Sequence, residues 1–413
     1  MRLLHTADWH LGHSLHGVAR DYEHCCFLDW LLDTLEHEQA DALLIAGDIF
    51  DSTNPPASAL ALFYSFLAAA RRRCPQLDIV VVAGNHDSPG RLDAPQPLLA
   101  QLGVHIVGTL PRNGAGEPDP NRLLTPLTDR RGAIAAWCAA VPFLRPADLP
   151  PSEAIEDALI AGVRQVYCQA LALTRDRLGP GQALIATGHC YMTGGQLSEL
   201  SERKILGGNQ HALPADIFPA EANYVALGHL HLAQAVGNRA HIRYSGSPIP
   251  LSLTEADYPH QVVRADFHKG HCADLAALRV PRTVDILRIP AGHPEPLDSV
   301  LTQLRQLEVT TQPSEQQPFL EVKVRLEQPE PGLRRRVDEA LDGKPVRLLR
   351  ITPYYPGEAG ALAELAPETH LPDLNPDTVF QQRYQQQYQN DPPPELLAAF
   401  HELLEQVQGA EAP

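Results

Sequence analysis

The chain lacks the features that mark membrane proteins and disulfide-stabilised proteins. Its 413 residues contain no run of about 18 apolar residues, which argues against a transmembrane helix. The N-terminal segment soon becomes polar and has no apolar core of a signal peptide. The seven cysteines are scattered and form no Cys-x-x-Cys pair, so neither a disulfide framework nor a zinc ribbon is expected. We therefore expect a protein of the reducing cytoplasm.

Positive charge is also scarce. The formal net charge is −17 at pH 7, which argues against a protein that coats nucleic acid with its whole surface. A local basic groove is compatible with this charge, and so is an anionic site that becomes cationic when divalent metals bind. Three arginine clusters, at 71–73, 130–131 and 334–336, are candidate phosphate contacts, although such clusters more often form a solvated face.

Short apolar runs alternate with helical periodicity over about the first 265 residues. Apolar residues between 27 and 35 recur at helical spacing, and a second helix is expected at about 57–72. The predicted strands are the N-terminal run and residues 42–47, 79–84, 104–108, 133–141, 183–188, 224–228 and 241–246. Residues 109–131, rich in Pro, Gly and Asn, predict a surface loop. This alternation predicts a layered α/β domain at 1–275 with strands buried between helices.

The pattern changes after about residue 280. Three further strands are expected at 284–289, 320–326 and 346–351, with helices at 297–307 and 333–341, so we predict a small α+β domain at 280–352. Residues 353–373 are rich in Pro, Gly, Ala and acids and predict a linker. Two amphipathic helical segments follow at 374–409. We expect their apolar stripe to bind a partner protein; docking on the chain's own domains is the alternative.

Five of the predicted strands end in side chains that can bind a metal. The run Ile79–Gly84, for example, leads straight into Asn85, His86 and Asp87. In an open α/β sheet the carboxyl ends of the strands meet in one crevice, where ligands bind. The candidate ligands at these five ends are Asp8, His10, Asp48, Asn85, His189, His229 and His231.

These residue types suit a pair of metal ions. Imidazole, carboxylate and amide oxygen favour Mn²⁺, Fe²⁺ or Zn²⁺, and no cysteine takes part. A carboxylate such as Asp48 can bridge two ions about 3.5–4 Å apart, which can hold both the attacking and the leaving oxygen of a phosphate ester. Each motif alone is weak, because an aspartate after a strand often caps a helix. The five together, in this order, predict a phosphoesterase site.

The order D-x-H, GD, GNHD, GH and GHxH resembles the calcineurin-like metallophosphoesterase superfamily. Longer stretches resemble the SbcD family, the nuclease subunits of bacterial SbcCD complexes, over nearly the whole chain. These stretches include DWHLG, GDIFD, AGNHDS, VPFLRP, IATGH, YVALGHLHLAQ and YSGSPIPLS. The resemblance implies an α/β metallophosphoesterase fold, a layered β-sandwich flanked by helices, with a small α+β capping domain for DNA recognition and a C-terminal helical hairpin.

The resemblance also implies a role for each matched residue. One Mn²⁺ would be held by Asp8, His10, Asp48 and His231. The other would be held by Asp48, Asn85, His189 and His229, and Mg, Fe or Zn are possible in place of Mn. His86 would be catalytic, as a proton donor to the leaving oxygen or a stabiliser of phosphorane charge, and Asp87 would orient it. The alternative for His86 alone is a structural histidine.

The activity implied by the resemblance is that of a Mn-dependent DNA nuclease in repair, replication and recombination. It would act as a 3′ to 5′ exonuclease on duplex ends and as an endonuclease on hairpins and single strands. ATP hydrolysis by an SbcC-type ATPase on the C-terminal helices would drive it, and helices near 57–102 would form a homodimer. Two other interpretations stay open: a small-molecule phosphodiesterase, and a scaffold subunit that bridges the ATPase to DNA ends. The extra domain and tail argue against the first, and the intact ligand set argues against the second.

Overall fold

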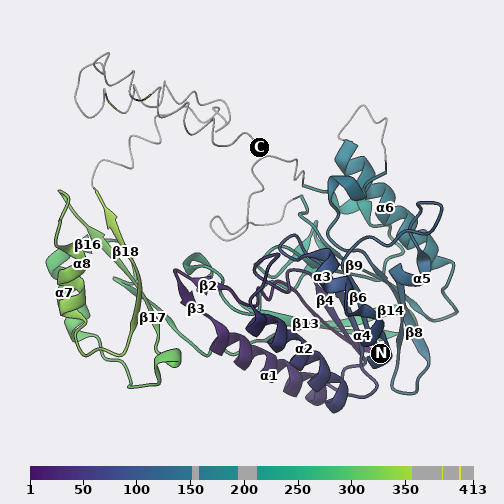
Figure 1. The fold of residues 1–413 in the computed structure, drawn as a ribbon, viewed down its shortest axis with the longest axis horizontal. Coiled ribbons are helices and arrows are strands. Elements are labelled where there is room, and N and C mark those ends of the chain that lie inside the picture. Colours follow the sequence, from purple (N-terminus) through teal and green to yellow (C-terminus); the bar gives the residue numbers. More distant parts are fainter. Residues whose placement is uncertain (151–157, 194–211, 356–383, 385–399, 401–413) are drawn as a thin grey trace.

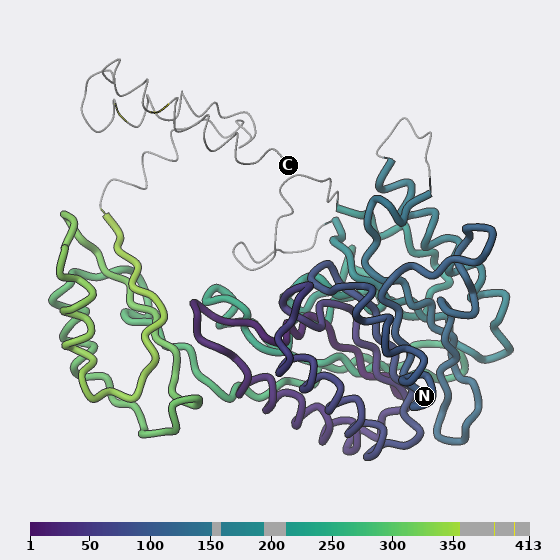
Figure 2. Tube along the Cα trace, in the orientation of Figure 1, coloured from purple at the N-terminus to yellow at the C-terminus, as the bar shows by residue number. Residues whose placement is uncertain are grey.

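The computed structural model describes residues 1–150, 158–193 and 212–355, together with Tyr384 and Phe400. Two six-stranded sheets pack face to face as a sandwich, and a small domain follows them in the chain (Figures 1 and 2). Nearly all of the predicted linker and all but two residues of the predicted tail lie outside the described residues. In the part of the chain that is described, no helix has the length and apolar character needed to cross a membrane.

The first sheet has the strand order β14-β13-β1-β4-β5-β6. Its parallel part consists of β1 (Arg2–Thr6), β4 (Ala42–Ala46), β5 (Asp78–Val82) and β6 (Val104–Val107). The antiparallel strands β13 (Gln261–His268) and β14 (His271–Arg279) extend it beyond β1. Parallel strands covered on both faces are largely apolar, as β4 is throughout and β5 is after its first residue, Asp78. Because β1, β4 and β5 are neighbours, the residues that follow them lie at one edge of the sheet.

The second sheet has the order β11-β12-β10-β9-β8-β7. Its parallel strands are β8 (Ile134–Ala140), β9 (Ala183–His189), β10 (Tyr224–Gly228) and β12 (Arg239–Tyr244). The antiparallel strands β7 (Leu124–Thr128) and β11 (Gln234–Val236) form its edges. Strands β9 and β10 pair with Gly228 opposite His189, so the two histidine motifs that end them are adjacent.

Helices cover the outer faces of both sheets, which gives four layers. Helices α1 (Asp21–His37) and α2 (Ala57–Arg73) pack on the first sheet, where Phe27 and Phe63 share a core with Ile45. Helix α6 (Ala158–Arg175) packs on the second sheet. Small apolar residues from both sheets, such as Ala42 and Ala226, fill the space between them. The predicted β-sandwich flanked by helices is confirmed.

Short elements connect these layers. Helices α3 (Pro89–Asp93) and α4 (Gln96–Leu99) lie between β5 and β6, and α5 (Pro120–Leu123) precedes β7. The hairpin of β2 (Ser14–Leu15) and β3 (Val18–Ala19) lies between the first strand and α1.

The small domain is a four-stranded parallel sheet with two helices on one face. Strand β17 (Phe319–Arg325) pairs with β15 (Ile286–Ile289), β16 (Glu295–Pro296) and β18 (Arg347–Tyr354). Helices α7 (Leu297–Gln306) and α8 (Leu333–Ala340) bury their apolar stripes in one core with the sheet. Figure 1 shows both helices on the side away from the sandwich, so the other face of the sheet is turned toward it.

Two segments differ from the sequence-based expectation. Residues 109–131, predicted to be a surface loop, contain α5 and the edge strand β7. Pro126 within β7 is tolerated because an edge strand needs fewer ladder hydrogen bonds. The prediction gave no strand for 261–279, where β13 and β14 form. Strand β14 is a largely exposed edge, so its sequence shows no clear apolar alternation.

Candidate metal centre

The ends of five parallel strands deliver the predicted ligands to one place. Strands β1, β4 and β5 come from the first sheet, and β9 and β10 from the second. The Nδ1–H of His189 donates to the carbonyl of Ala46 over 2.9 Å, which joins the end of β9 to the end of β4. The backbone N–H of His229 donates to Asp8 over 2.9 Å, which joins the end of β10 to the end of β1.

The first group of candidate ligands comprises Asp8, His10 and His231. Their ligand atoms lie within 4.8 Å of one another, and all three residues are buried. Asp8 Oδ2 and His10 Nε2 have no hydrogen-bond partner among the described residues. A buried polar atom without a partner destabilises the fold by about 1–3 kcal/mol, and a bound cation would remove that penalty. This donor set therefore fits a divalent ion.

The second group comprises Asp48, His189 and His229, whose ligand atoms also lie within 4.8 Å of one another. Asn85 Oδ1 lies 2.9 Å from His189 Nε2 and 3.0 Å from His229 Nδ1, so it belongs to this group. Asp48 Oδ2 lies 3.3 Å from His189 Nε2 and 3.6 Å from His10 Nε2. The structure thus brings all seven predicted ligands together, with Asp48 between the two groups.

Glycines let the strand ends approach this closely. A Cβ atom on Gly84 would lie 2.1 Å from Asp48 Oδ1 and 2.3 Å from the Asp48 backbone nitrogen. A Cβ atom on Gly228 would lie 1.9 Å from the carbonyl oxygen of Ala46. Both positions lack room for any side chain, because backbone atoms cannot move aside.

Burial and mutual charge shift the pKa of several of these groups in the metal-free protein. Burial raises the pKa of Asp8 to about 7. Burial opposes the charged form of His189, but the neighbouring Asp48 carboxylate outweighs it and raises the pKa of that imidazole to about 9. Burial likewise opposes ionisation of Asp48, but the histidines around it hold its pKa well below the usual range. Without a metal, Asp48 and His189 are therefore an ion pair.

His86 lies beside the first group and is almost completely buried. Its ring centroid is 4.7 Å from that of His10. Its Nδ1–H donates to the carbonyl oxygen of Asp51 over 2.8 Å, which leaves Nε2 with a lone pair or a second proton. Its backbone N–H donates to Asp48 over 2.8 Å.

Asp87 does not make the contact expected of it. Its carboxylate accepts hydrogen bonds from the backbone N–H groups of Ile49, Phe50 and Gly84, at 3.2, 3.0 and 2.8 Å. The imidazole of His86 is oriented by the Asp51 carbonyl instead. These hydrogen bonds give no direct contact by which Asp87 would orient the His86 imidazole, so that role stays a prediction. Asp87 joins the residues after β4 to those after β5, because its carboxylate bonds Ile49 and Phe50 on one side and Gly84 on the other.

Two further residues, which the sequence did not point to, contact the predicted ligands. Asp51 Oδ1 lies 3.3 Å from His10 Nδ1, and its place three residues after Asp48 could have suggested this. Glu255 accepts a hydrogen bond from His231 Nδ1 over 2.9 Å. It comes from a distant loop with no metal motif, so no local signal marked it.

The sequence matches two protein families and several proteins of known name. Residues 1–233 match the calcineurin-like phosphoesterase family, and residues 282–388 match the family described as the type 5 capsule protein repressor C-terminal domain. The SbcD subunit of the nuclease SbcCD from Rhodobacter capsulatus is 42% identical over 386 residues, which cover 92% of this chain and 93% of that protein. The SbcD subunit from Escherichia coli K12 is 34% identical over 393 residues, 93% and 92% of the two chains. That from Bacillus subtilis is 39% identical over 272 residues, 65% and 67% of the two chains.

Proposed function

The chain belongs to the SbcD family of calcineurin-like phosphoesterases, and from this we propose that it is the Mn²⁺-dependent DNA nuclease subunit of an SbcCD-type complex. The observation that carries the proposal is the two adjacent ligand groups, because Asp48 of the second group lies only 3.6 Å from His10 of the first. Asp8, His10, Asp48 and His231 would hold one ion, and Asp48, Asn85, His189 and His229 the other. Mg, Fe and Zn are the other metals that this donor set accepts.

The side chains around the metals would each have a defined task. Two bound divalent ions lower the pKa of water and offset charge on the phosphate oxygens. His86 would give the proton to the leaving 3′-oxygen, and the Asp51 carbonyl would keep the imidazole in place through Nδ1. Asp87 would fix the backbone on which Asp48 and His86 sit.

The open face of the small-domain sheet supports DNA as the substrate. On β17 and β18 the apolar residues Val322 and Ile351 belong to the core with the helices, so Lys323, Arg325 and Arg350 lie on the other face. That face of the sheet is turned toward the sandwich (Figure 1), and the chain as a whole has a net charge of −17. Glu321 also lies on this face and pairs with Arg288, so the face keeps a net positive charge, which suits contact with a phosphate backbone. We therefore assign DNA recognition to residues 280–352 and hydrolysis to residues 1–275.

Partners would bind at two further places. The predicted linker at 353–373 would carry the helices at 374–409 to an SbcC-type ATPase, whose ATP hydrolysis would drive exonuclease action on duplex ends and cutting of hairpins and single strands. A homodimer would form through helices near 57–102. The side chains of Leu98 and Leu102 in this region are 75% and 46% exposed in the single chain. A second copy of the chain would remove this apolar surface from water. The complex would work in the cytoplasm, in DNA repair, replication and recombination.

Cleavage of a labelled hairpin-ended duplex tests the proposal. The full chain alone should cut it with Mn²⁺ and not without, and Asp48→Ala should not cut it at all. Equal cutting by this variant would place the activity outside the proposed site. Turnover of a chromogenic phosphodiester without any cutting of DNA, even when an SbcC-type ATPase and ATP are added, would identify a small-molecule phosphodiesterase instead. A chain that binds DNA ends and cleaves neither substrate would be a scaffold subunit.

A further inference from the structure

Glu255 connects a predicted metal ligand to a loop outside the centre. It is buried, and its Oε1 accepts the hydrogen bond from His231 Nδ1. Its Oε2 accepts a hydrogen bond from the backbone N–H of Leu251 over 2.8 Å. The segment from Pro250 to Asp257, here called the Glu255 loop, thus holds the carboxylate in place. Because His231 Nδ1 is the donor, Nε2 keeps its lone pair for a metal.

Arginines from outside the Glu255 loop hold its backbone. Arg288 on β15 of the small domain donates to the carbonyl of Leu253 and lies 2.9 Å from Asp257 Oδ2. Arg282, just before the small domain, donates to the carbonyl of Ala256. Arg20 donates to the carbonyl of Pro250 over 2.7 Å. The side chains of residues 282 and 288 therefore fix the turn from which Glu255 projects.

Apolar contacts join the same loop to the small domain. Leu253 shares a buried cluster with Val284 and Phe319, the first residue of β17. The guanidinium of Arg20 lies 5.2 Å from the centre of the Phe319 ring. A displacement of β15 or β17 would therefore move the Glu255 loop as well.

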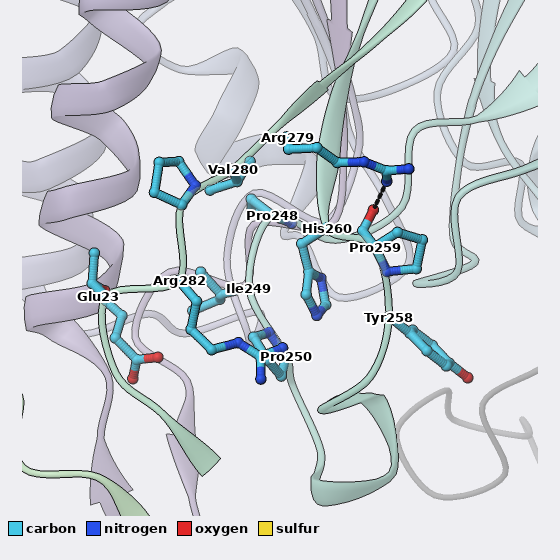
Figure 3. A pocket seen from close by; sticks show the side chains of 12 residues that line it. Glu23, Pro248, Ile249, Pro250, Tyr258, Pro259, His260, Arg279, Val280 and Arg282 are labelled. Atoms are coloured by element: carbon cyan, nitrogen blue, oxygen red, sulfur yellow. Dashed lines mark hydrogen bonds between the residues drawn. The ribbon is translucent and has the colours of Figure 1, made fainter.

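The loop also has space beside it. A pocket of about 180 Å³ lies next to its first residue and is lined by Pro250, Tyr258, His260, Arg279 and Arg282 (Figure 3). Close-packed interiors resist small displacements, whereas a segment next to a pocket can shift with less loss of packing.

We propose that Glu255 is a positioning residue for His231, and that the small domain sets its position through Arg288. The inference rests on the proposed function, because it takes His231 as a metal ligand. His231 lies only in the group with Asp8 and His10, so the effect should fall on one of the two ions. The position of the small domain would then tune the metal that this group holds.

Calorimetric titration of the full-length, metal-free protein with MnCl₂ tests the proposal. Glu255→Gln should weaken one of the two Mn²⁺ sites by about 10–100-fold and leave the other unchanged. Arg288→Met should weaken the same site by a smaller factor, because it removes the anchors of the loop and not the carboxylate. Arg335→Met is the matched control: this arginine of the same domain is 73% exposed, pairs with Glu339 on its own helix, and should leave both sites as they are.

Each outcome of this titration decides one part of the proposal. Wild-type affinities in Arg288→Met would overturn the role of the small domain, and wild-type affinities in Glu255→Gln would overturn that of Glu255. Equal weakening of both sites would make Glu255 a structural residue only. If Glu255→Gln has a much lower melting temperature without metal, its Mn²⁺ affinity is not informative. Arg288→Met then tests the proposal, because the Arg288 side chain is 22% exposed and its replacement leaves the buried carboxylate in place. Wild-type protein that binds fewer than two ions would refute the proposed function itself.

Discussion

Several predicted ligands have backbone angles that residues with a side chain seldom adopt. The φ angles of Asp8, His10 and Asp48 are 56°, 47° and 49°, and that of His229 is 107°. Each such residue carries strain of about 1–3 kcal/mol and persists only where its surroundings impose the conformation. Here the N–H of Asp8 donates to the Gly47 carbonyl and that of His10 to the Asp48 carbonyl, both over 3.0 Å. These strained conformations lie at the two groups of candidate ligands and turn their side chains toward each other.

Replacing His86 separates proton transfer from metal binding. His86→Ser should keep both Mn²⁺ ions, because His86 belongs to neither ligand set in the proposal. Cleavage should fall about 10²–10⁴-fold, the usual contribution of a positioned general acid. Metal analysis and single-turnover cleavage of the hairpin duplex measure the two effects. Unchanged turnover would remove His86 from the mechanism, and loss of a metal would make it a ligand.

Mn²⁺ binding should depend on pH in a direction that the pKa values fix. In the metal-free protein, His189 with a pKa of about 9 is protonated at neutral pH, and Asp8 with a pKa of about 7 is partly so. A metal needs both groups deprotonated, so binding releases protons. Apparent Mn²⁺ affinity should therefore rise with pH between about 7 and 9 and level off above 9. Calorimetry in buffers of different ionisation enthalpy counts the released protons; an affinity independent of pH would contradict these assignments.

The turn after β5 leaves no room for a side chain at Gly84. Gly84→Ala should destabilise the fold by about 1–3 kcal/mol, because the new Cβ meets the backbone of Asp48. It should also weaken both Mn²⁺ sites, since the proposal has Asp48 bind both ions. Gly90→Ala is the matched control, because a Cβ there has nothing within 4 Å. Thermal unfolding and Mn²⁺ titration of the two variants compare them, and equal behaviour would show that the close approach at Gly84 is unimportant.

The sequence predicts the elements at the centre better than those at the edges. Strands β4 and β5 are buried on both faces, so their apolar runs ending in Asp48 and Asn85 were readily recognised. Edge strands such as β7 and β14 have mixed patterns, because one side is exposed. Contacts between distant segments leave no local signal, and for that reason Glu255 was missed. The contacts of Asp87 differ from those expected, because sequence adjacency to His86 does not show where a side chain points.

At the scale of the whole molecule, exposed leucines allow a test of the predicted homodimer. Leu98 is 75% exposed and lies in the region expected to dimerise. Leu98→Glu should shift the protein toward monomer, because a charge would be buried in the interface without a partner. Ile134→Glu is the control. Ile134 is an apolar residue that is 38% exposed and lies outside the predicted interface, so this change should leave the oligomeric state unchanged. Sedimentation equilibrium compares the variants with wild type; a wild-type monomer would refute the dimer.

Charge distribution links the small domain to the centre at the same scale. The chain is acidic overall, yet Lys323, Arg325 and Arg350 lie on the face of the small-domain sheet opposite α7 and α8. Arg288 on that sheet also donates hydrogen bonds to Asp257 and the Leu253 carbonyl of the Glu255 loop. The proposed DNA-binding face and the arginine that holds the Glu255 loop therefore belong to one sheet.

Anomalous scattering at the manganese edge, from crystals of the full chain grown with Mn²⁺, tests the central claim most directly. Our account predicts two peaks about 3.5–4 Å apart, separated by Asp48. One should lie among Asp8, His10 and His231, and the other among Asn85, His189 and His229. A single peak at full occupancy, or peaks away from these side chains, would contradict the two-metal centre and the nuclease chemistry proposed from it.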